Sequence, residues 1–484
     1  MAAAGARSSF VPDAGARGWA EVAARAGKVG GARVEDAWPR TRRPLPWLFA
    51  GFLAVIFLVP IKAIHLKVQL PVSSDFDRFF VAAIVATWAI GGLIGRGETV
   101  VRLRPRGWAA GMSAFVFVAV ASIAVNVDRI TNLGEWDLVQ KRVALLVALV
   151  AVFAVVTLSL RVAELRPFAV LIAVLAVVTA LGTVYEKKSG YNVFYAGAAA
   201  VLAPVASVDP APTEADPDLN QGRPLITGPT KHPLSVTSIL GMALPFAVVL
   251  AAVAFDPRRR LLWALAACTI VAGALITQRK SGLVIPAFAL LALFMLRPRL
   301  LLRLAPYGIA ALALAVAIAP GAFSSFQELG RADSQASIEG RTADYPAIVP
   351  DLLSNPLLGR GYGTLDPSRV DTDRIFDNEY LGEALQVGGL GLIAFLALIV
   401  TPLFVVRSVL RSDSPLRGPP ALAAAASCVA FGVAAALYDI LSFPQAPYLF
   451  LFVAAMCTCA ASAEVSTGRR ALPVPKGRSE LVKA

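Results

Sequence analysis

Long apolar runs separated by short polar stretches make up most of this chain. Runs long enough to cross a hydrocarbon core of roughly 30 Å as an α-helix recur from end to end. We place predicted spans at 46–64, 79–95, 108–125, 143–160, 167–184, 234–254, 261–277, 281–296, 301–320, 381–406, 419–441 and 446–463. The apolar stretch 193–206 is too short to cross and is expected to lie at the interface or to re-enter the membrane. The pattern predicts an all-α polytopic membrane protein with about twelve transmembrane helices.

Composition excludes an ordinary water-soluble domain. Of the 484 residues, 57% are hydrophobic and only 16% are charged, and the mean hydropathy is +0.68. The predicted organisation is a disordered basic cytoplasmic tail (1–43), helices one to nine (44–320) with an outer loop at 185–233, a large outer loop between the ninth and tenth spans (321–380), helices ten to twelve (381–463), and a second basic tail (464–484).

The distribution of arginine predicts the orientation of these helices. Basic residues near span ends are retained on the cytoplasmic side, and arginine clusters here occupy alternate connections and both tails. We therefore expect both termini in the cytoplasm and both long polar loops, 185–233 and 321–380, on the outer face. The net charge of +13 lies largely in these connections and tails. Anionic lipid headgroups are its expected partner, and nucleic acid is not.

Some basic residues depart from this rule, because they are predicted on the outer face, and four of them are candidates for binding a ligand. They are Arg223, Arg279, Lys280 and Arg341. Cations kept at the outer mouth of a helix bundle favour a shared pocket for an anionic ligand. The alternative is that they extend to the phosphates of outer-leaflet lipids.

The loop 321–380 concentrates polar and glycine residues that a passive connection does not need. It contains Gly340-Arg341-Thr342, then Asn355-Pro356-Leu357-Leu358-Gly359-Arg360-Gly361-Tyr362-Gly363, then Asp377-Asn378-Glu379-Tyr380-Leu381. The glycines at 359, 361 and 363 lack the strand-turn-helix context of a phosphate-binding loop. They favour a tight backbone turn where the loop folds back onto the bundle.

In their order, these motifs resemble the O-antigen ligase and polymerase superfamily of polytopic bacterial membrane glycosyltransferases. The resemblance covers roughly 220–395. It rests on four features: Arg223 before a Gly-Pro step, the turn Arg279-Lys280-Ser281-Gly282, Arg341 with the glycine-rich motif at 355–363, and Asn378-Glu379-Tyr380-Leu381 followed by Gly388-Gly389-Leu390-Gly391.

This resemblance implies the transfer of a glycan from a polyprenyl-pyrophosphate carrier to an acceptor hydroxyl, at the outer face of a bacterial cytoplasmic membrane, in surface polysaccharide biosynthesis. The implied partners are that donor, a glycan or lipid-glycan acceptor, and membrane lipid. Arg223, Arg279 and Arg341, with Lys280 as an auxiliary, are the residues we expect to bind the pyrophosphate and to stabilise the charge that develops as it leaves.

The catalytic base departs from the family pattern. Ligases of this family typically carry histidine immediately before the Asn-x-Tyr-Leu element, and this chain has Asp377 there. The candidates for the base are Asp377, then Glu379, then His232; a polymerase or a divergent enzyme that uses no such base is the further alternative. No metal or soluble cofactor is implied, and all four cysteines fall inside predicted spans.

Two other functions remain open from the sequence. A multi-spanning transporter or flippase of lipid-linked glycans or small solutes would have a similar number of spans. However, carriers usually place charges or broken helices near the bilayer midplane, and the predicted spans here are almost free of charge. An inactive structural partner in an envelope-polymer complex is the third possibility. Retained activity after substitution of Arg279 would favour either of these over the transferase.

Overall fold

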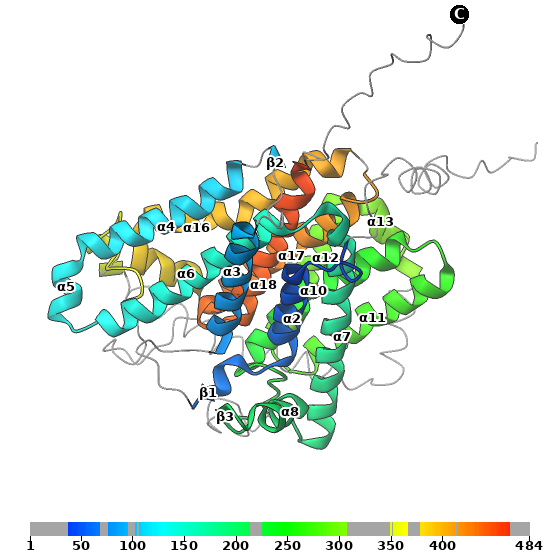
Figure 1. The fold of residues 1–484 in the computed structure, drawn as a ribbon, viewed down its shortest axis with the longest axis horizontal. Helices are drawn as coiled ribbons and strands as arrows, with labels where there is room; N and C mark the ends of the chain where they lie inside the picture. Colours follow the sequence, from blue (N-terminus) through cyan, green and yellow to red (C-terminus); the bar gives the residue numbers. More distant parts are fainter. Residues whose placement is uncertain are drawn as a thin grey trace, which may run out of the picture.

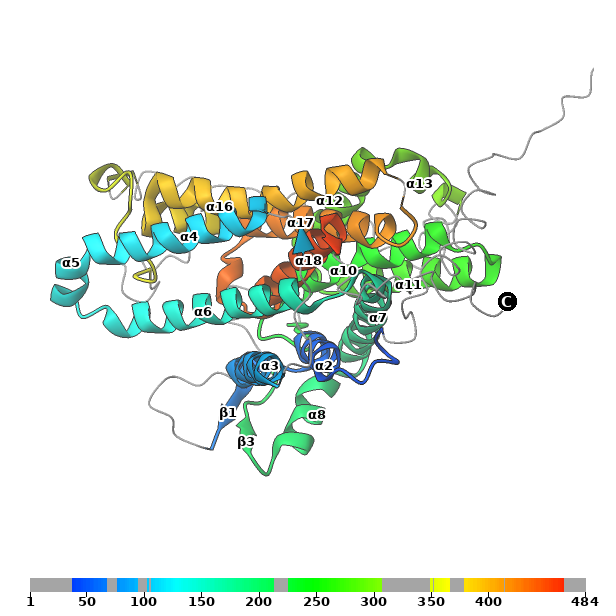
Figure 2. The same ribbon diagram turned by 45° about the horizontal axis from the view of Figure 1, so that its top comes forward.

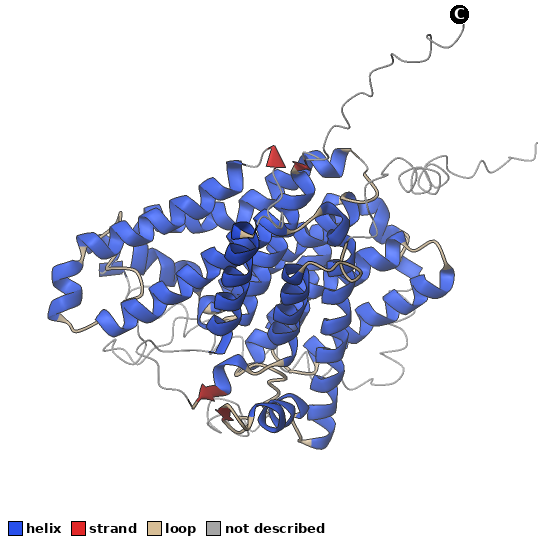
Figure 3. Cartoon of the chain, in the orientation of Figure 1, coloured by secondary structure: helices blue, strands red, loops and turns tan. Residues whose placement is uncertain are grey.

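The protein is mostly helical in the computed structural model, which describes residues 37–67, 76–94, 102–103, 106–212, 225–306, 349–350, 352–365, 378–412 and 414–464 (Figures 1 and 3). The helices are α2 (Pro44–Leu58), α3 (Phe76–Leu93), α4 (Arg106–Val125), α5 (Val127–Asn132), α6 (Trp136–Ser159), α7 (Leu165–Ser189), α8 (Val193–Leu202), α10 (Pro233–Val253), α11 (Pro257–Leu275), α12 (Ser281–Leu296), α13 (Pro298–Leu302), α16 (Glu379–Arg411), α17 (Gly418–Leu437) and α18 (Gln445–Ala461). Short 3₁₀ turns lie at Ile61–Ala63, Val162–Glu164 and Ile440–Ser442.

Six helices in the described part of the chain are long and apolar enough to cross a membrane. They are Phe76–Leu93, Trp136–Ser159, Val162–Ser189, Pro233–Val253, Glu379–Arg411 and Gly418–Leu437. The apolar helices α2, α8, α12 and α18 and the apolar part of α4 are shorter, and α11 is not among the six because three arginines open it. A mostly helical fold with helices long enough to span a membrane is confirmed. The count of twelve spans stays a prediction, since most of the ninth range, 301–320, and most of the loop 321–380 lie outside the described residues.

Helix α10 forms the centre of the bundle. It contacts α7, α11, α12, α17 and α18, and Figure 2 shows it enclosed by these helices. Its sequence is apolar on every face, with small polar side chains such as Ser235 and Thr237 near its first turn. A helix that is apolar all round is stable only when it is buried on all sides. The side chains of α10 are accordingly buried almost throughout.

Contacts between distant segments gather at two ends of the bundle. At one end Arg43 pairs with Glu164 at 2.5 Å, and strand β2 (Arg102–Leu103) pairs with β4 (Ala463–Glu464). At the other end β1 (Ile64–Leu66) pairs antiparallel with β3 (Ala206–Val208). Each pair joins segments that the arginine distribution predicts on the same side of the membrane. Which end faces outward remains a prediction.

Helix α16 is broken near its start, and a loop fills the break. Gly388 has φ 68° and ψ −170°, a conformation essentially confined to glycine. Residues 355–365, the glycine loop, lie along this break: the amides of Arg360 and Gly361 donate to the carbonyls of Leu385 and Gln386, at 2.9 and 3.0 Å. In return, the amide of Gly389 donates to the carbonyl of Pro356 at 2.8 Å. The loop therefore satisfies backbone groups that the break would leave without partners.

The predicted turn of the 359–363 glycines is confirmed. Gly359, Gly361 and Gly363 all have positive φ, at 63°, 115° and 85°. The loop is also tied to α4, since Ser122 Oγ donates to the carbonyl of Leu358 at 2.6 Å and Asn126 Nδ2 donates to that of Gly359 at 3.1 Å. The loop thus folds back onto the bundle at the first turns of α16.

Candidate functional site

Three carboxyl groups lie close together beside the first turns of α16. The helix starts at Asn378, whose side chain caps it by accepting from the amide of Tyr380 at 3.0 Å. Glu379 and Glu383 follow one turn apart, and they are only 2% and 1% exposed. Asp439, in the connection between α17 and α18, completes the group through a hydrogen bond with Glu379. We call Glu379, Glu383 and Asp439 the acidic cluster.

The cation beside the acidic cluster is Arg142, from the first half of α6. Its Nη2 donates to Ser442 Oγ at 3.2 Å and lies 3.7 Å from Asp439 Oδ1. Ser442 Oγ in turn donates to Asp439 Oδ2. The glycine loop covers the arginine stem, because a Cβ on Gly363 would come within 2.8 Å of the Cβ of Arg142. Glycine at position 363 therefore allows the loop to approach α6 closely.

Arg142 stabilises the ionised form of Asp439. Burial alone would raise the pKa of this carboxyl, but the Arg142 guanidinium and hydrogen bonds from Glu379 and Ser442 hold the pKa below its ordinary value. Its side chain remains 31% exposed. Asp439 is therefore the ionised and most accessible member of the cluster. In the described part of the chain, no three His, Cys, Asp or Glu side chains are grouped so as to hold a metal ion.

His232 stands at the start of α10. Its Nδ1 accepts from the amide of Leu234 at 3.2 Å, so the imidazole caps the helix. Burial and the neighbouring Arg279 guanidinium lower the pKa of His232 to about 4. The ring is thus neutral at pH 7, and its proton is on Nε2 because Nδ1 is occupied as an acceptor.

A buried carboxylate holds the segment that leads to His232. Glu186, near the end of α7, accepts from the amides of Thr227 and Gly228 at 3.3 and 2.8 Å. Asn192 donates to both Glu186 and the carbonyl of Gly228, at 2.9 and 2.8 Å. These bonds fix the backbone four and five residues before the histidine, so its position does not depend on the cap alone.

Arg279 and Lys280 lie in a tight turn between α11 and α12. The preceding residue, Gln278, has a φ of 56°, in the left-handed region that non-glycine residues rarely occupy. A Cβ on Gly282 would come within 2.3 Å of the carbonyl oxygen of Ala274. Arg279 is half-buried beside His232, whereas Lys280 is exposed. The turn therefore directs one cation toward the bundle and leaves the other at its surface.

Residues 438–443 connect the acidic cluster with the histidine. The amide of Leu441 donates to Glu379 Oε2 at 2.9 Å, and the ring of Phe443 lies 5.6 Å from that of His232. Tyr438 anchors the segment to α10 by donating to Ser238 Oγ at 2.7 Å. One short segment therefore contacts the acidic cluster on one side. On its other side it contacts the neutral imidazole of His232, which lies beside the Arg279 guanidinium.

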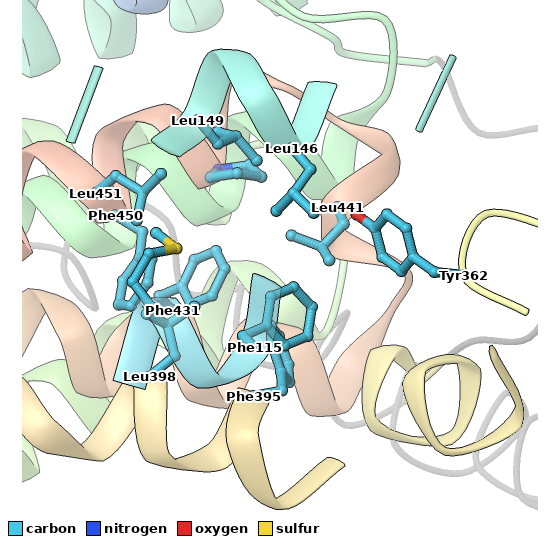
Figure 4. Close-up of a pocket in the computed structure, with 12 residues that line it drawn as sticks. Phe115, Leu146, Leu149, Tyr362, Phe395, Leu398, Phe431, Leu441, Phe450 and Leu451 are labelled. Atoms are coloured by element: carbon cyan, nitrogen blue, oxygen red, sulfur yellow. The ribbon is translucent and has the colours of Figure 1, made fainter. Parts of the chain in front are cut away.

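A small cavity of about 30 Å³ adjoins the acidic cluster. Its lining is apolar apart from the Tyr362 hydroxyl and comes from α4, α6, α16, α17, α18, the glycine loop and the turn at Ile440–Ser442. In Figure 4, Tyr362 and Leu441 stand at one side of this cavity, with the aromatic rings of Phe115 and Phe395 below them. Burial raises the pKa of Tyr362, and the Glu383 carboxyl adds to the effect, so the hydroxyl stays protonated.

The structure brings together three of the seven residues chosen from the sequence. Glu379, His232 and Arg279 flank residues 438–443, while Lys280 lies at the surface. Arg223, Arg341 and Asp377 fall outside the described residues, so their positions are not tested. Roles for all seven remain proposals.

Sequence reasoning missed Arg142, Glu383 and Asp439. Each of them has a feature in the sequence that could have identified it as a candidate. Arg142 adjoins a predicted outer connection and breaks the same charge rule as Arg279. Glu383 and Asp439 are acids inside the predicted spans 381–406 and 419–441, and an ionisable residue within a span is a functional candidate.

Comparison with known families agrees with the site. Residues 269–396 match the family model described as O-antigen ligase. The match begins in α11 and ends in α16, so it includes Arg279, Glu379 and Glu383. The resemblance predicted from the sequence is confirmed over these residues, which are similar to the O-antigen ligase family. No curated protein sequence matches the chain. The findings together support a membrane protein of surface polysaccharide biosynthesis.

Proposed function

We propose that the protein is a membrane glycosyltransferase that moves a glycan from a polyprenyl-pyrophosphate carrier to an acceptor hydroxyl. One observation carries this proposal: residues 438–443 hold the acids of α16 on one side and His232 with Arg279 on the other. Glycosyl transfer from a pyrophosphate needs both kinds of group, since a hydroxyl loses a proton while a leaving group gains negative charge. The family match covers the acids and Arg279.

We propose that Arg279 faces the leaving pyrophosphate, together with Arg223, Arg341 and, as an auxiliary, Lys280. A guanidinium can donate two parallel hydrogen bonds to phosphate oxygens, and its charge stabilises the leaving group most where water is excluded. Arg279 is half-buried, which fits that role. His232 suits a donor better than a base, because its Nδ1 already accepts a hydrogen bond and its pKa is low.

Asp377 remains the first proposed base and Glu379 the second. Glu379 is buried and already accepts from the amide of Leu441, so it reaches an acceptor only through a neighbouring group. We further propose about twelve spans, both termini in the cytoplasm, and an active site on the outer face of a bacterial cytoplasmic membrane. The alternate placement of arginine clusters supports that orientation.

Glycan analysis in a deletion strain tests the function. The strain would be complemented with wild type, Arg279→Ala, Asp377→Ala or, as a matched control, Arg299→Ala, which removes an exposed arginine just beyond α12. We expect Arg279→Ala to abolish transfer and Arg299→Ala to preserve it at equal expression. Full-length polymer stranded on its carrier would indicate a ligase, and single repeat units on the carrier would indicate a polymerase. Unchanged envelope glycans in every strain would refute the transferase.

A carrier of lipid-linked glycans is the second candidate function. The break in α16 at Gly388, beside the buried Glu383, is an arrangement that transporters also use. Purified protein in liposomes distinguishes the two functions. A transferase forms a new glycosidic bond between added donor and acceptor, whereas a carrier moves the donor between leaflets and leaves its chemistry unchanged.

A further inference from the structure

The hydrogen bonds of the acidic cluster form a continuous path. Glu383 is hydrogen-bonded to Glu379, and Glu379 is hydrogen-bonded to Asp439. Two carboxyl groups bond to each other in this way only when one of them carries a proton. Since Asp439 is ionised, we place that proton on Glu379, the middle member, which shares it with Asp439 and Glu383. The path runs from a glutamate that is 1% exposed to an aspartate whose side chain is 31% exposed.

The inner end of the path has a vacant acceptor. Glu383 Oε2 is buried and has no hydrogen-bond partner among the described residues. Such atoms are rare in folded proteins, because leaving them unpaired is costly, and each one calls for an explanation. The charged and titratable groups around Glu383 are Arg142 from α6, Tyr362 from the glycine loop, Glu379 from its own helix and Asp439 from residues 438–443. The only cation in this set, Arg142, is engaged with Ser442 and Asp439.

The outer end of the path is suited to meet a substrate. Arg142 and Ser442 fix the Asp439 carboxylate in place, and its exposed part is open to a hydroxyl donor. Alone, an aspartate with a lowered pKa would be a weak base. The hydrogen bond to Glu379 removes that limitation, since a proton that arrives at Asp439 can displace one inward within the same step.

We propose that Asp439, Glu379 and Glu383 form a proton relay that takes the proton of the acceptor hydroxyl at Asp439 and stores its equivalent at Glu383. This inference rests on the proposed glycosyl transfer. In that step the acceptor O–H bond breaks, its oxygen bonds to the anomeric carbon, and the bond from that carbon to the pyrophosphate oxygen breaks with its electron pair. The proton binds Asp439 while the proton that Glu379 shares moves to the Glu383 carboxylate, and the reverse shift later returns one proton to water through Asp439. In this relay Asp439, rather than Asp377, receives the proton, with Glu379 acting through it. Asp439 is then a catalytic residue, and Glu383 and Arg142 are positioning residues.

The test measures kcat and KM against pH for purified protein in liposomes, with a polyprenyl-pyrophosphate-linked oligosaccharide as donor and an oligosaccharide as acceptor. For Glu383→Gln we expect kcat to fall about 100-fold or more, with the KM for donor within about twofold of wild type. The dependence of kcat on acid pH should change as well. Glu383→Asp, which keeps a carboxyl group, should recover part of kcat.

Glu164→Gln is the matched control, since it removes another fully buried carboxylate, paired with Arg43 at the opposite end of the bundle. A normal kcat and an unchanged pH profile in Glu383→Gln would overturn the relay. If Glu383→Gln does not fold, Asp439→Asn is measured in its place. A wild-type kcat and pH profile in Asp439→Asn would also overturn the relay. Failure of the proposed function looks different, because wild-type protein would then form no glycosidic bond at all.

Discussion

At the scale of single residues, His232 combines a structural and an electrostatic role. It caps α10 through Nδ1, and burial together with Arg279 lowers its pKa from 6.5 to about 4. A histidine that is neutral when folded but protonated when unfolded destabilises the fold as the pH falls between these two values. Above pH 6.5 both states are neutral, so the effect is absent there.

Replacing His232 with asparagine should therefore reduce the loss of stability in acid. Asparagine also caps helices, so α10 should still start at the same residue. We expect the wild-type melting temperature to fall between pH 6.5 and about pH 4, and His232→Asn to fall less. The difference is at most about 3 kcal/mol at the acid end. Thermal melts of purified protein in detergent measure this, with His65→Asn at the exposed β1–β3 pair as control. Parallel curves for wild type and His232→Asn would refute the assignment.

The residues that were found and missed differ in the kind of signal they leave. Arg279 was predicted from the charge rule and Glu379 from a motif, both of which are local in the sequence. Asp439 lies 60 residues beyond Glu379, and Arg142 lies more than 200 residues before it. No local pattern says that these side chains meet. In addition, hydropathy averaged over a span hides a single acid such as Glu383 within an otherwise apolar helix.

At the scale of elements, the break in α16 and the glycine loop act as one unit. A Cβ on Gly388 would come within 2.3 Å of the carbonyl carbon of Leu357, and one on Gly359 within 2.5 Å of that of Gln386. Both contacts are with backbone, which cannot rotate away as a side chain can. The sequence predicted a tight turn from these glycines. It did not predict the break at Gly388, because the hydropathy pattern of 381–406 is that of one continuous apolar span.

Gly388→Ala should consequently detach the glycine loop from α16. The substitution adds a clash with Leu357 and disfavours the positive φ, so we expect a loss of several kcal/mol or failure to accumulate. Gly51→Ala in α2 is the control, since nothing lies within 4 Å of its Cβ position, and it should be neutral or stabilising by up to about 1 kcal/mol. Size-exclusion profiles after heating in detergent compare the two. Equal stability would mean that the loop does not depend on the break.

At the scale of the whole molecule, the hydropathy pattern predicted the helices well because lipid imposes a simple rule on length and polarity. Helices lie at the predicted ranges from 46–64 to 281–296 and from 381–406 to 446–463. Their arrangement was not predictable in the same way. Packing around α10 depends on which faces fit together, and an apolar sequence that faces lipid resembles one that faces another helix.

The contacts at each end give the predicted topology a direct test. On a background without the four native cysteines, single cysteines would replace the exposed Ser189 after α7, Ser354 before the glycine loop and Ser412 after α16. A membrane-impermeant maleimide should label positions 189 and 354 in intact cells, and position 412 only after the membrane is permeabilised, since the arginine distribution predicts the first two outside and the third inside.

The reverse labelling pattern would mean that the protein has the opposite orientation in the membrane. The acidic cluster would then face the cytoplasm, where a glycan carried on the outer leaflet could not reach it. Labelling of position 354 but not of position 189 would place the two positions on opposite sides of the membrane, although the structure places both segments at one end of the bundle. Lys187 of α7 donates to Gln278 at 3.4 Å, His232 lies beside Phe443, and Leu441 donates to Glu379. Arg279, the residue after Gln278, lies beside His232, so these contacts connect α7 to the start of α16. A split result would contradict this packing in either orientation of the protein.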